Sequence, residues 1–158
     1  MTAAPAGNAS YTAAFSVDQT QGEVFSAINN VRGWWSEDIG GDADKAGGEF
    51  DYRYKDTHRC RIKVTELVPG ERVAWHVVDS YFDFTRDSAE WKDTAIRFDI
   101  TARDGKSVIR FVHTGLVPAC ECYDVCSSFW DFYLYTSLRT LIRTGQGLPN
   151  RKERAASA

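Results

Sequence analysis

The chain has little of what marks several common classes of protein. Among its 158 residues stand one methionine, four cysteines and three histidines. A disulfide among the four cysteines is disfavoured, because Cys122 and Cys126 on a regular helix present bridge geometry poorly and a reducing compartment is expected. The longest apolar runs, such as Val77-Val78, span a few residues, far short of the about 20 that cross a bilayer. A disulfide scaffold is therefore disfavoured, a membrane-spanning helix is excluded, and no membrane partner is expected.

The chain also has no large excess of positive or of negative charge. Nineteen Lys and Arg stand against 22 Asp and Glu, which gives a net charge of −3 and a pI near 5.6. Phosphate backbones are neutralised by clustered cations, so no nucleic-acid partner is expected. Residues 1–7 contain neither the cationic start nor the apolar run of a secretory signal. We therefore expect a cytoplasmic location with reduced thiols.

Composition divides the chain into one domain and two tails. Residues 1–9 and 149–158 are small or charged and carry no apolar periodicity, so disordered tails are expected there. Residues 10–148 contain no repeat, linker or low-complexity tract, which indicates a single domain. A chain of this length buries about two thirds of its unfolded surface, enough for a substantial core.

Alternating apolar residues predict an antiparallel sheet with one face in water. Strands are expected near residues 11–17, 49–55, 59–65, 72–78, 96–101 and 107–116. Residues 38–48, rich in glycine and acidic residues, are expected to form a loop. Thr20 is expected to cap an amphipathic helix that runs to about Asn30. A long second helix is expected to start near Pro118 and to stop at Gly145.

Short segments carry a resemblance to a known superfamily over nearly the whole of residues 11–146. In chain order they are Val24-Phe25-Ser26-Ala27-Ile28, Trp34-Trp35, Gly48-Glu49-Phe50, Val64-Thr65-Glu66-Leu67-Val68-Pro69, Val73-Ala74-Trp75, His113-Thr114-Gly115-Leu116, Trp130, Ser137-Leu138 and Leu141. In these segments the chain resembles the START/Bet v 1-like (SRPBCC) superfamily and, within it, the heat-shock-protein-90 ATPase activator-like family.

The resemblance implies an α+β helix-grip (Bet v 1-like) fold. In this fold a curved antiparallel sheet of about six strands wraps a long C-terminal helix, and one or two short helices follow the first strand. The resemblance implies no single activity, because relatives include lipid and hormone carriers, polyketide cyclases and a co-chaperone domain.

The aromatic residues give the clearest functional indication. Five Trp, seven Tyr and nine Phe accompany the single Met. Rigid rings favour a shaped cavity, and buried Tyr and Trp polar groups need partners that a cavity supplies. We therefore expect a cavity between the sheet and the C-terminal helix. Its candidate ligand-binding residues are Trp35, Tyr52, Tyr54, Cys60, Ile62, Trp75, Phe98, Phe111, His113, Cys126, Trp130 and Tyr133.

Two further groups of aromatic residues are expected outside this cavity. A segment between two expected strands predicts a lid over the cavity mouth; it contains Tyr81, Phe82, Phe84 and Trp91. The outer turns of the long helix are expected to expose apolar rings that suit self-association or a chaperone partner; these rings are Phe129, Phe132 and Tyr135.

The cysteines and histidines have no familiar metal-binding spacing. Cys122 and Cys126 share a face of the expected helix, but closed zinc sites use other spacings and buried cysteine is common. A mixed site that adds Cys60, His58 and His113 is the minor alternative. The glycine pairs begin no phosphate-binding loop. No metal and no cofactor are therefore expected.

Enzyme activity stays open, although a non-enzymatic role is favoured. His113 with a cavity Tyr or Glu66 would suit cyclase or hydrolase chemistry, and only Glu66 and Asp79 are acids that alternation places inward. No nucleophile elbow is present. The favoured function is binding of a small apolar, aromatic or lipid-like ligand. The alternatives are a co-chaperone-like interaction domain and a cyclase- or hydrolase-type enzyme.

Overall fold

Residues 10–55 and 57–150 are described by the computed structural model. The strands are β1 (Tyr11–Val17), β2 (Ile39–Gly41), β3 (Glu49–Tyr54), β4 (His58–Val68), β5 (Arg72–Phe82), β6 (Ala95–Arg103) and β7 (Lys106–Thr114). They form a seven-stranded sheet in the order β1-β7-β6-β5-β4-β3-β2, with every neighbouring pair antiparallel. Strand alternation in the sequence therefore predicts most of the sheet.

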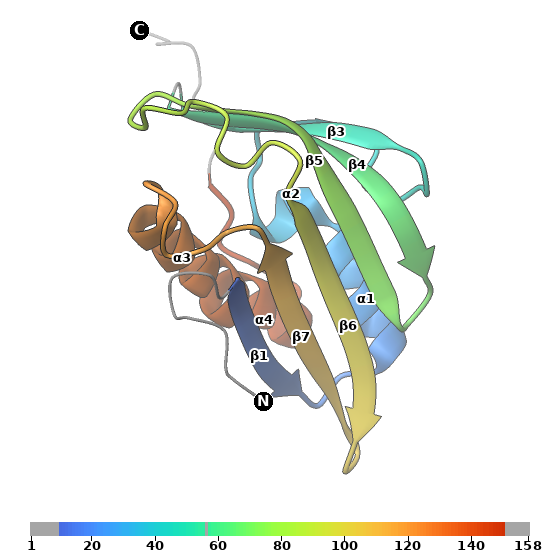
Figure 1. The fold of residues 1–158 in the computed structure, drawn as a ribbon. Helices are drawn as coiled ribbons and strands as arrows, with labels where there is room; N and C mark the ends of the chain where they lie inside the picture. The colour runs from blue at the N-terminus through green and yellow to red at the C-terminus, as the bar shows by residue number, and fades with distance from the viewer. Residues whose placement is uncertain (1–9, 56, 151–158) are drawn as a thin grey trace, which may run out of the picture.

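The helices gather on one side of the curved sheet (Figure 1). They are α1 (Gln21–Asn29), α2 (Val31–Trp34), α3 (Tyr123–Asp131), the π-helical segment η2 (Phe132–Leu138) and α4 (Arg139–Thr144). The last three follow one another without a gap and form the long C-terminal helix. Thr20 caps α1 by accepting a hydrogen bond from the Glu23 amide, as the sequence predicts. This arrangement confirms the helix-grip fold.

Aromatic rings fill the middle of the space between sheet and helices. Trp35 stacks on Trp75, with ring centroids 5.8 Å apart and planes 4° from parallel. On another side of Trp35 lies Trp130, at 5.1 Å. Phe98 from β6 meets the edge of Trp75 at 5.2 Å. Full burial of each such ring contributes about 1.5–3 kcal/mol relative to exposure. The aromatic residues therefore build the core of the domain.

β2 corrects the expectation of a continuous loop over residues 38–48. Ile39 pairs with Tyr52, and Gly41 pairs with Phe50. A Cβ atom on Gly41 would lie 2.4 Å from the carbonyl oxygen of Glu49, and its φ is +110°. Only glycine fits this approach without strain. The glycine that suggests a loop in the sequence thus permits a seventh strand.

A bulge in β5 changes which residues belong to the lid. The register between β4 and β5 shifts near Ile62, where Val77 and Asp79 face consecutive residues of β4. An extra residue in one strand reverses the alternation that follows it. Phe82 therefore lies inside and Tyr81 outside, and both belong to β5. The expectation that they lie in a lid loop is wrong.

The two ends of the long helix also differ from expectation. The helix starts at Tyr123, because turns occupy the segment after Pro118. Gly145, with φ of +84°, ends it as expected. Beyond it, the Asn150 amide group donates to the Ser36 hydroxyl at 2.8 Å. The folded part therefore reaches Asn150. Residues 1–9 and 151–158, where tails are expected, lie outside the described residues.

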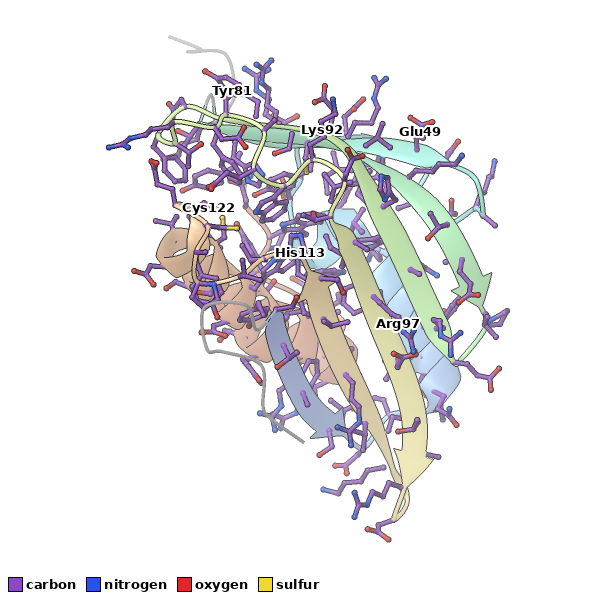
Figure 2. All side chains as sticks on the ribbon, in the orientation of Figure 1. Glu49, Tyr81, Lys92, Arg97, His113 and Cys122 are labelled. Atoms are coloured by element: carbon purple, nitrogen blue, oxygen red, sulfur yellow. The ribbon has the colours of Figure 1, made fainter. Side chains whose placement is uncertain are left out.

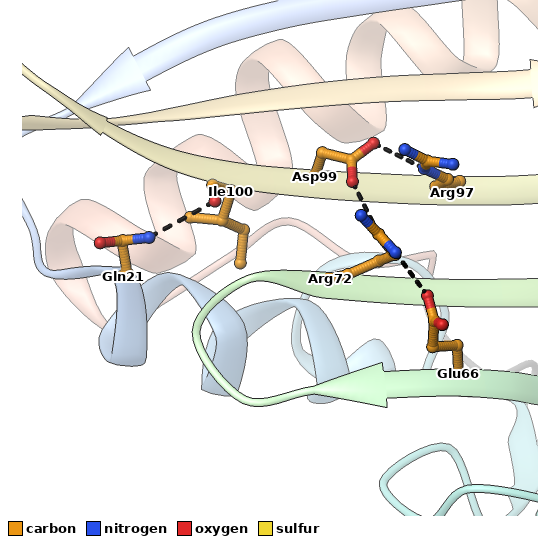
Figure 3. Close-up of polar contacts among 6 residues, drawn as sticks. All are labelled: Gln21, Glu66, Arg72, Arg97, Asp99 and Ile100. Atoms are coloured by element: carbon orange, nitrogen blue, oxygen red, sulfur yellow. Dashed lines mark hydrogen bonds and ion pairs between the residues drawn. The ribbon is translucent and has the colours of Figure 1, made fainter.

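The outer face of the sheet carries a row of ion pairs (Figure 3). Arg72 on β5 contacts Glu66 on β4 at 3.0 Å and Asp99 on β6 at 2.9 Å. Asp99 also accepts from Arg97 at 2.7 Å. At one end of this face Gln21 donates to the Ile100 carbonyl and connects α1 to the sheet.

None of the helices in the described ranges has the length and apolar character needed to cross a membrane.

Candidate functional site

A pocket of about 190 Å³ opens where the end of the sheet, the β5–β6 loop and α3 meet. Strands β3, β4 and β5 form one wall, the β5–β6 loop forms the second, and the C-terminal helix forms the third. The lining residues are Trp35, Tyr52, Tyr54, Thr57, His58, Phe82, Phe84, Trp91, Val125, Cys126, Phe129, Trp130 and Tyr133. None of them is an acid, a lysine or an arginine, so the pocket suits an uncharged molecule.

Reciprocal hydrogen bonds join the loop to the start of α3. The Glu90 carboxylate accepts from the backbone amides of Glu121 and Cys122, both at 2.9 Å. The Glu121 carboxylate in turn accepts from the amide of Arg86 at 3.3 Å. Figure 2 shows Cys122 at this helix start, below the strand end that carries Tyr81. A carboxylate at a helix N-terminus is favourable, so these contacts hold the loop over the pocket.

His58 lies in the pocket wall between aromatic rings. Its imidazole stacks on Phe82 at 4.2 Å between centroids and meets Trp91 edge-on at 4.6 Å. Burial lowers its pKa to about 3, because the charged form loses its hydration. His58 is therefore neutral at pH 7.

His113 lies next to the pocket and holds one of its walls. The Trp130 indole donates to Nδ1 of His113 at 3.1 Å, and Nε2 lies 2.8 Å from the Thr94 hydroxyl. That hydroxyl donates to the carbonyl of Trp91. An indole only donates, so Nδ1 accepts and Nε2 carries the proton. Burial lowers the pKa of His113 to about 3. Both nitrogens are engaged in the structure, so His113 positions Trp130, and it is not itself a lining residue of this pocket.

The acids expected to face the interior face the solvent. Glu66 pairs with Arg72 on the outer face of the sheet (Figure 3). Asp79 is exposed because the bulge in β5 turns it outward, and its carboxylate accepts from the amide of Ser80. The expected partnership of His113 with Glu66 is therefore wrong.

The structure divides the predicted cavity residues into two groups. Those at the pocket are Trp35, Tyr52, Tyr54, Cys126, Trp130 and Tyr133. Those buried in the core without lining the pocket are Cys60, Ile62, Trp75, Phe98, Phe111 and His113. The second group lies deeper, where neighbouring rings fill the space. Within the pocket, burial raises the pKa of Tyr133 to about 12, and burial together with the neighbouring Tyr133 raises the pKa of Tyr52 well above its ordinary value.

Several lining residues were missing from the predicted set. They are Thr57, His58, Phe82, Phe84, Trp91, Val125 and Phe129. A signal for some of them was present, because the predicted lid contains three of these rings and His58 shares a strand face with Cys60. No sequence signal marks Val125, and Phe129 is expected among the exposed rings on the outer turns of the long helix, where it is in fact half-exposed while also lining the pocket.

The cysteines are reduced and serve packing. All four are free thiols, and three of them are buried. A contact with the Cys126 thiol, together with burial, raises the pKa of Cys122 far above its ordinary value. A protonated thiol is a poor nucleophile and metal ligand. Within residues 10–55 and 57–150 no three His, Cys, Asp or Glu side chains gather closely enough to hold a metal ion.

Solved structures share this fold at low sequence identity. The Aha1 dimer from Colwellia psychrerythraea is 21% identical with a TM-score of 0.71, over 88% of this chain and 99% of that one. MLL2253 from Mesorhizobium loti is 12% identical with a TM-score of 0.64, over 87% and 100%. CalU16 from Micromonospora echinospora is 15% identical with a TM-score of 0.59, over 87% and 75%.

The sequence itself matches a family profile. No curated protein gives a match to the chain. The profile described as Activator of Hsp90 ATPase homolog 1-like protein matches residues 23–143, which is well over half of the chain. The resemblance read from the sequence is thereby confirmed, and the protein belongs to the Activator of Hsp90 ATPase homolog 1-like family.

Proposed function

We propose that the protein binds one small apolar molecule, an aromatic ring or a short acyl chain, in the pocket between β3–β5, the β5–β6 loop and α3. The observation that carries this proposal is the pocket of about 190 Å³ with its uncharged, mainly aromatic lining. An apolar cavity of about 150 Å³ accepts benzene, whereas pockets for drug-sized ligands span roughly 300–1,000 Å³. The size therefore supports a single-ring ligand over a sterol, a polycyclic polyketide or a phospholipid.

A ligand would enter between the loop and the helix. Phe84 on the loop and Phe129 on α3 are both lining residues and both exposed, so they mark the mouth. Opening the mouth would break the hydrogen bonds that the Glu90 carboxylate accepts from the backbone amides at the start of α3. These bonds lie near the surface and cost little to exchange for water. A cyclase or hydrolase role has less support, because no carboxylate lines the pocket.

Replacing Val125 with tryptophan is expected to abolish ligand binding. The larger side chain would occupy the mouth, because Val125 lines the pocket while remaining exposed. Native mass spectrometry of protein purified from its own host is the measurement, and the co-purifying small molecule should be missing from the variant. Phe132→Trp is the matched control, since Phe132 is exposed on the same helix outside this pocket. A wild-type protein that carries no small molecule and binds no single-ring compound would contradict the proposal.

A second candidate function is self-association through the apolar face of the C-terminal helix. This face is defined by Val125, Phe129 and Phe132, and together with Leu148, which follows the helix, they are exposed and line one shallow groove. Exposed apolar groups gathered in this way mark protein interaction sites. The similar protein from Colwellia psychrerythraea was solved as a dimer, which supports a second copy of this chain as the occupant.

The variant Phe132→Asp is expected to weaken this dimer at least about 30-fold, because it places a charge at the centre of an apolar contact. Sedimentation velocity over a concentration series measures the dissociation constant. The control is Tyr81→Asp, an exposed ring on the outer side of β5. A monomeric wild type at high concentration rejects self-association. The family description then makes Hsp90 the partner to test, through its ATPase rate with each variant.

A further inference from the structure

Two buried nitrogens in the pocket wall have no hydrogen-bond partner among the described residues. They are Nε2 of His58 and Nε1 of Trp91. Both residues line the pocket, and both are more than nine-tenths buried. Their rings meet edge to face with centroids 4.6 Å apart. A buried polar group without a partner destabilises the fold, and two such atoms in one pocket wall indicate that something else binds them.

Two other tryptophan indoles and the other buried histidine have hydrogen-bond partners. The Trp34 indole donates to the carbonyl of Ile28 at 3.0 Å, and the Trp130 indole donates to His113. Both nitrogens of His113 are engaged. The fold therefore supplies a partner for the Trp34 indole in the core and for the indole of Trp130, another lining residue of the pocket, but none for Trp91. Trp75 is a useful comparison, because its Nε1 is also unpartnered while the residue lies outside the pocket.

We infer that the ligand carries one uncharged oxygen, a carbonyl or a hydroxyl, at the inner end of its apolar body, and that Trp91 Nε1 and His58 Nε2 bind this oxygen. The inference rests on the proposed function and adds the polar group that orients the ligand. Trp91 only donates, so the ligand atom facing it is an acceptor. A carboxylate does not fit, because no cation lines the pocket and an unpaired buried charge is costly.

A carbonyl oxygen and a hydroxyl oxygen require different tautomers of His58. A carbonyl oxygen accepts from Trp91 and from a protonated Nε2. A hydroxyl accepts from Trp91 and donates to an Nε2 that carries no proton. A neutral imidazole provides either form by exchanging its tautomer. The shared chemistry is an oxygen lone pair directed at the Trp91 indole.

Matched pairs of probes test the inference. Phenol and toluene have nearly the same shape, as do acetophenone and α-methylstyrene, and only the first of each pair carries the oxygen. Titrations followed by tryptophan fluorescence and calorimetry give the affinities. The variant Trp91→Phe keeps the ring and loses the N–H. Its affinity for phenol and acetophenone is expected to fall about tenfold, while that for the hydrocarbons stays within about twofold.

The control variant is Trp75→Phe, which removes an unpartnered indole N–H outside the pocket. It is expected to leave the phenol-to-toluene ratio unchanged. His58→Phe, which keeps the stack on Phe82, provides a second variant and should reduce the same ratio. Hydrocarbon binding reports that each variant is folded.

The outcomes separate the two proposals. If no probe binds the wild type, the proposed function fails. If toluene and phenol bind but Trp91→Phe leaves their ratio unchanged, only the polar recognition fails. Benzoate binding more tightly than phenol would overturn the requirement for an uncharged oxygen.

Discussion

Acidification from pH 6.5 to pH 5 is expected to lower the free energy of unfolding by about 3 kcal/mol. His58 and His113 both have a pKa of about 3 in the folded protein, because burial removes the hydration of the imidazolium. In the unfolded chain the pKa returns to about 6.5. Above pH 6.5 both states hold neutral imidazoles and the full stability is present. Below it the unfolded chain takes up protons that the folded protein excludes, so stability falls until about pH 3.

Each histidine contributes about 0.7 kcal/mol per pH unit at pH 6.5, where half of the unfolded imidazoles are protonated, and about 1.4 kcal/mol per pH unit by pH 5. Urea titrations at pH 7, 6, 5.5 and 5 measure the slope, and this window lies above the ordinary pKa of carboxylates, about 4. His58→Phe is expected to halve the slope. His76→Gln is the control, because His76 is partly exposed beside Asp93. A free energy of unfolding that is constant from pH 7 to pH 5 would contradict the prediction.

The hydrogen bonds of His113 explain why its neutral form matters. Protonation of Nδ1 would remove the acceptor of the Trp130 indole and leave two donors facing each other. The hydrogen bonds from Nε2 to Thr94 and from Thr94 to the Trp91 carbonyl would remain, so the loss falls on Trp130. Protonation of His113 would therefore disturb the pocket wall at Trp130 as well as lower the global stability.

Much of the fold follows from local sequence patterns. The alternation of Phe50 and Tyr52 with charged neighbours predicts β3, and Thr20 predicts the start of α1. The bulge in β5 is different, because it depends on how two distant strands pair. After the bulge the inward positions become Ser80 and Phe82 instead of Asp79 and Tyr81. A one-residue change in register reverses every later assignment, so alternation alone misplaced this segment.

Strand alternation predicts which side chains face the helices, but not which of them line the pocket and which lie deeper in the core. Alternation correctly turns Tyr52 and Trp75 toward the helices, and both are buried. Only Tyr52 lines the pocket, because β3 ends beneath the β5–β6 loop while Trp75 lies under Trp35 in the middle of the sheet. Depth depends on where the loop and α3 cover the sheet. That coverage is set by long-range contacts such as those of Glu90, which carry no periodic signal.

Replacing Trp130 with alanine is expected to lower the free energy of unfolding by about 3–5 kcal/mol and to create a site for indole. The cost arises because a fully buried ring is lost and Nδ1 of His113 loses its donor. Trp130 lines the pocket, so the space it leaves joins the existing pocket of about 190 Å³. Free indole has the same rings and the same N–H as the lost side chain, and is expected to fill that space.

Thermal unfolding with and without indole provides the measurement. At a free concentration one hundred times its dissociation constant, indole is expected to restore about 2.7 kcal/mol to Trp130→Ala. Trp75→Ala is the matched control, since it removes an equally buried tryptophan that does not line the pocket. Its loss of stability should be similar, and indole should restore little of it, because the new space is closed off by Trp35 and Phe98. Equal rescue of both variants would mean that the core opens without regard to the pocket, and the proposed entry between the β5–β6 loop and α3 would have to be abandoned.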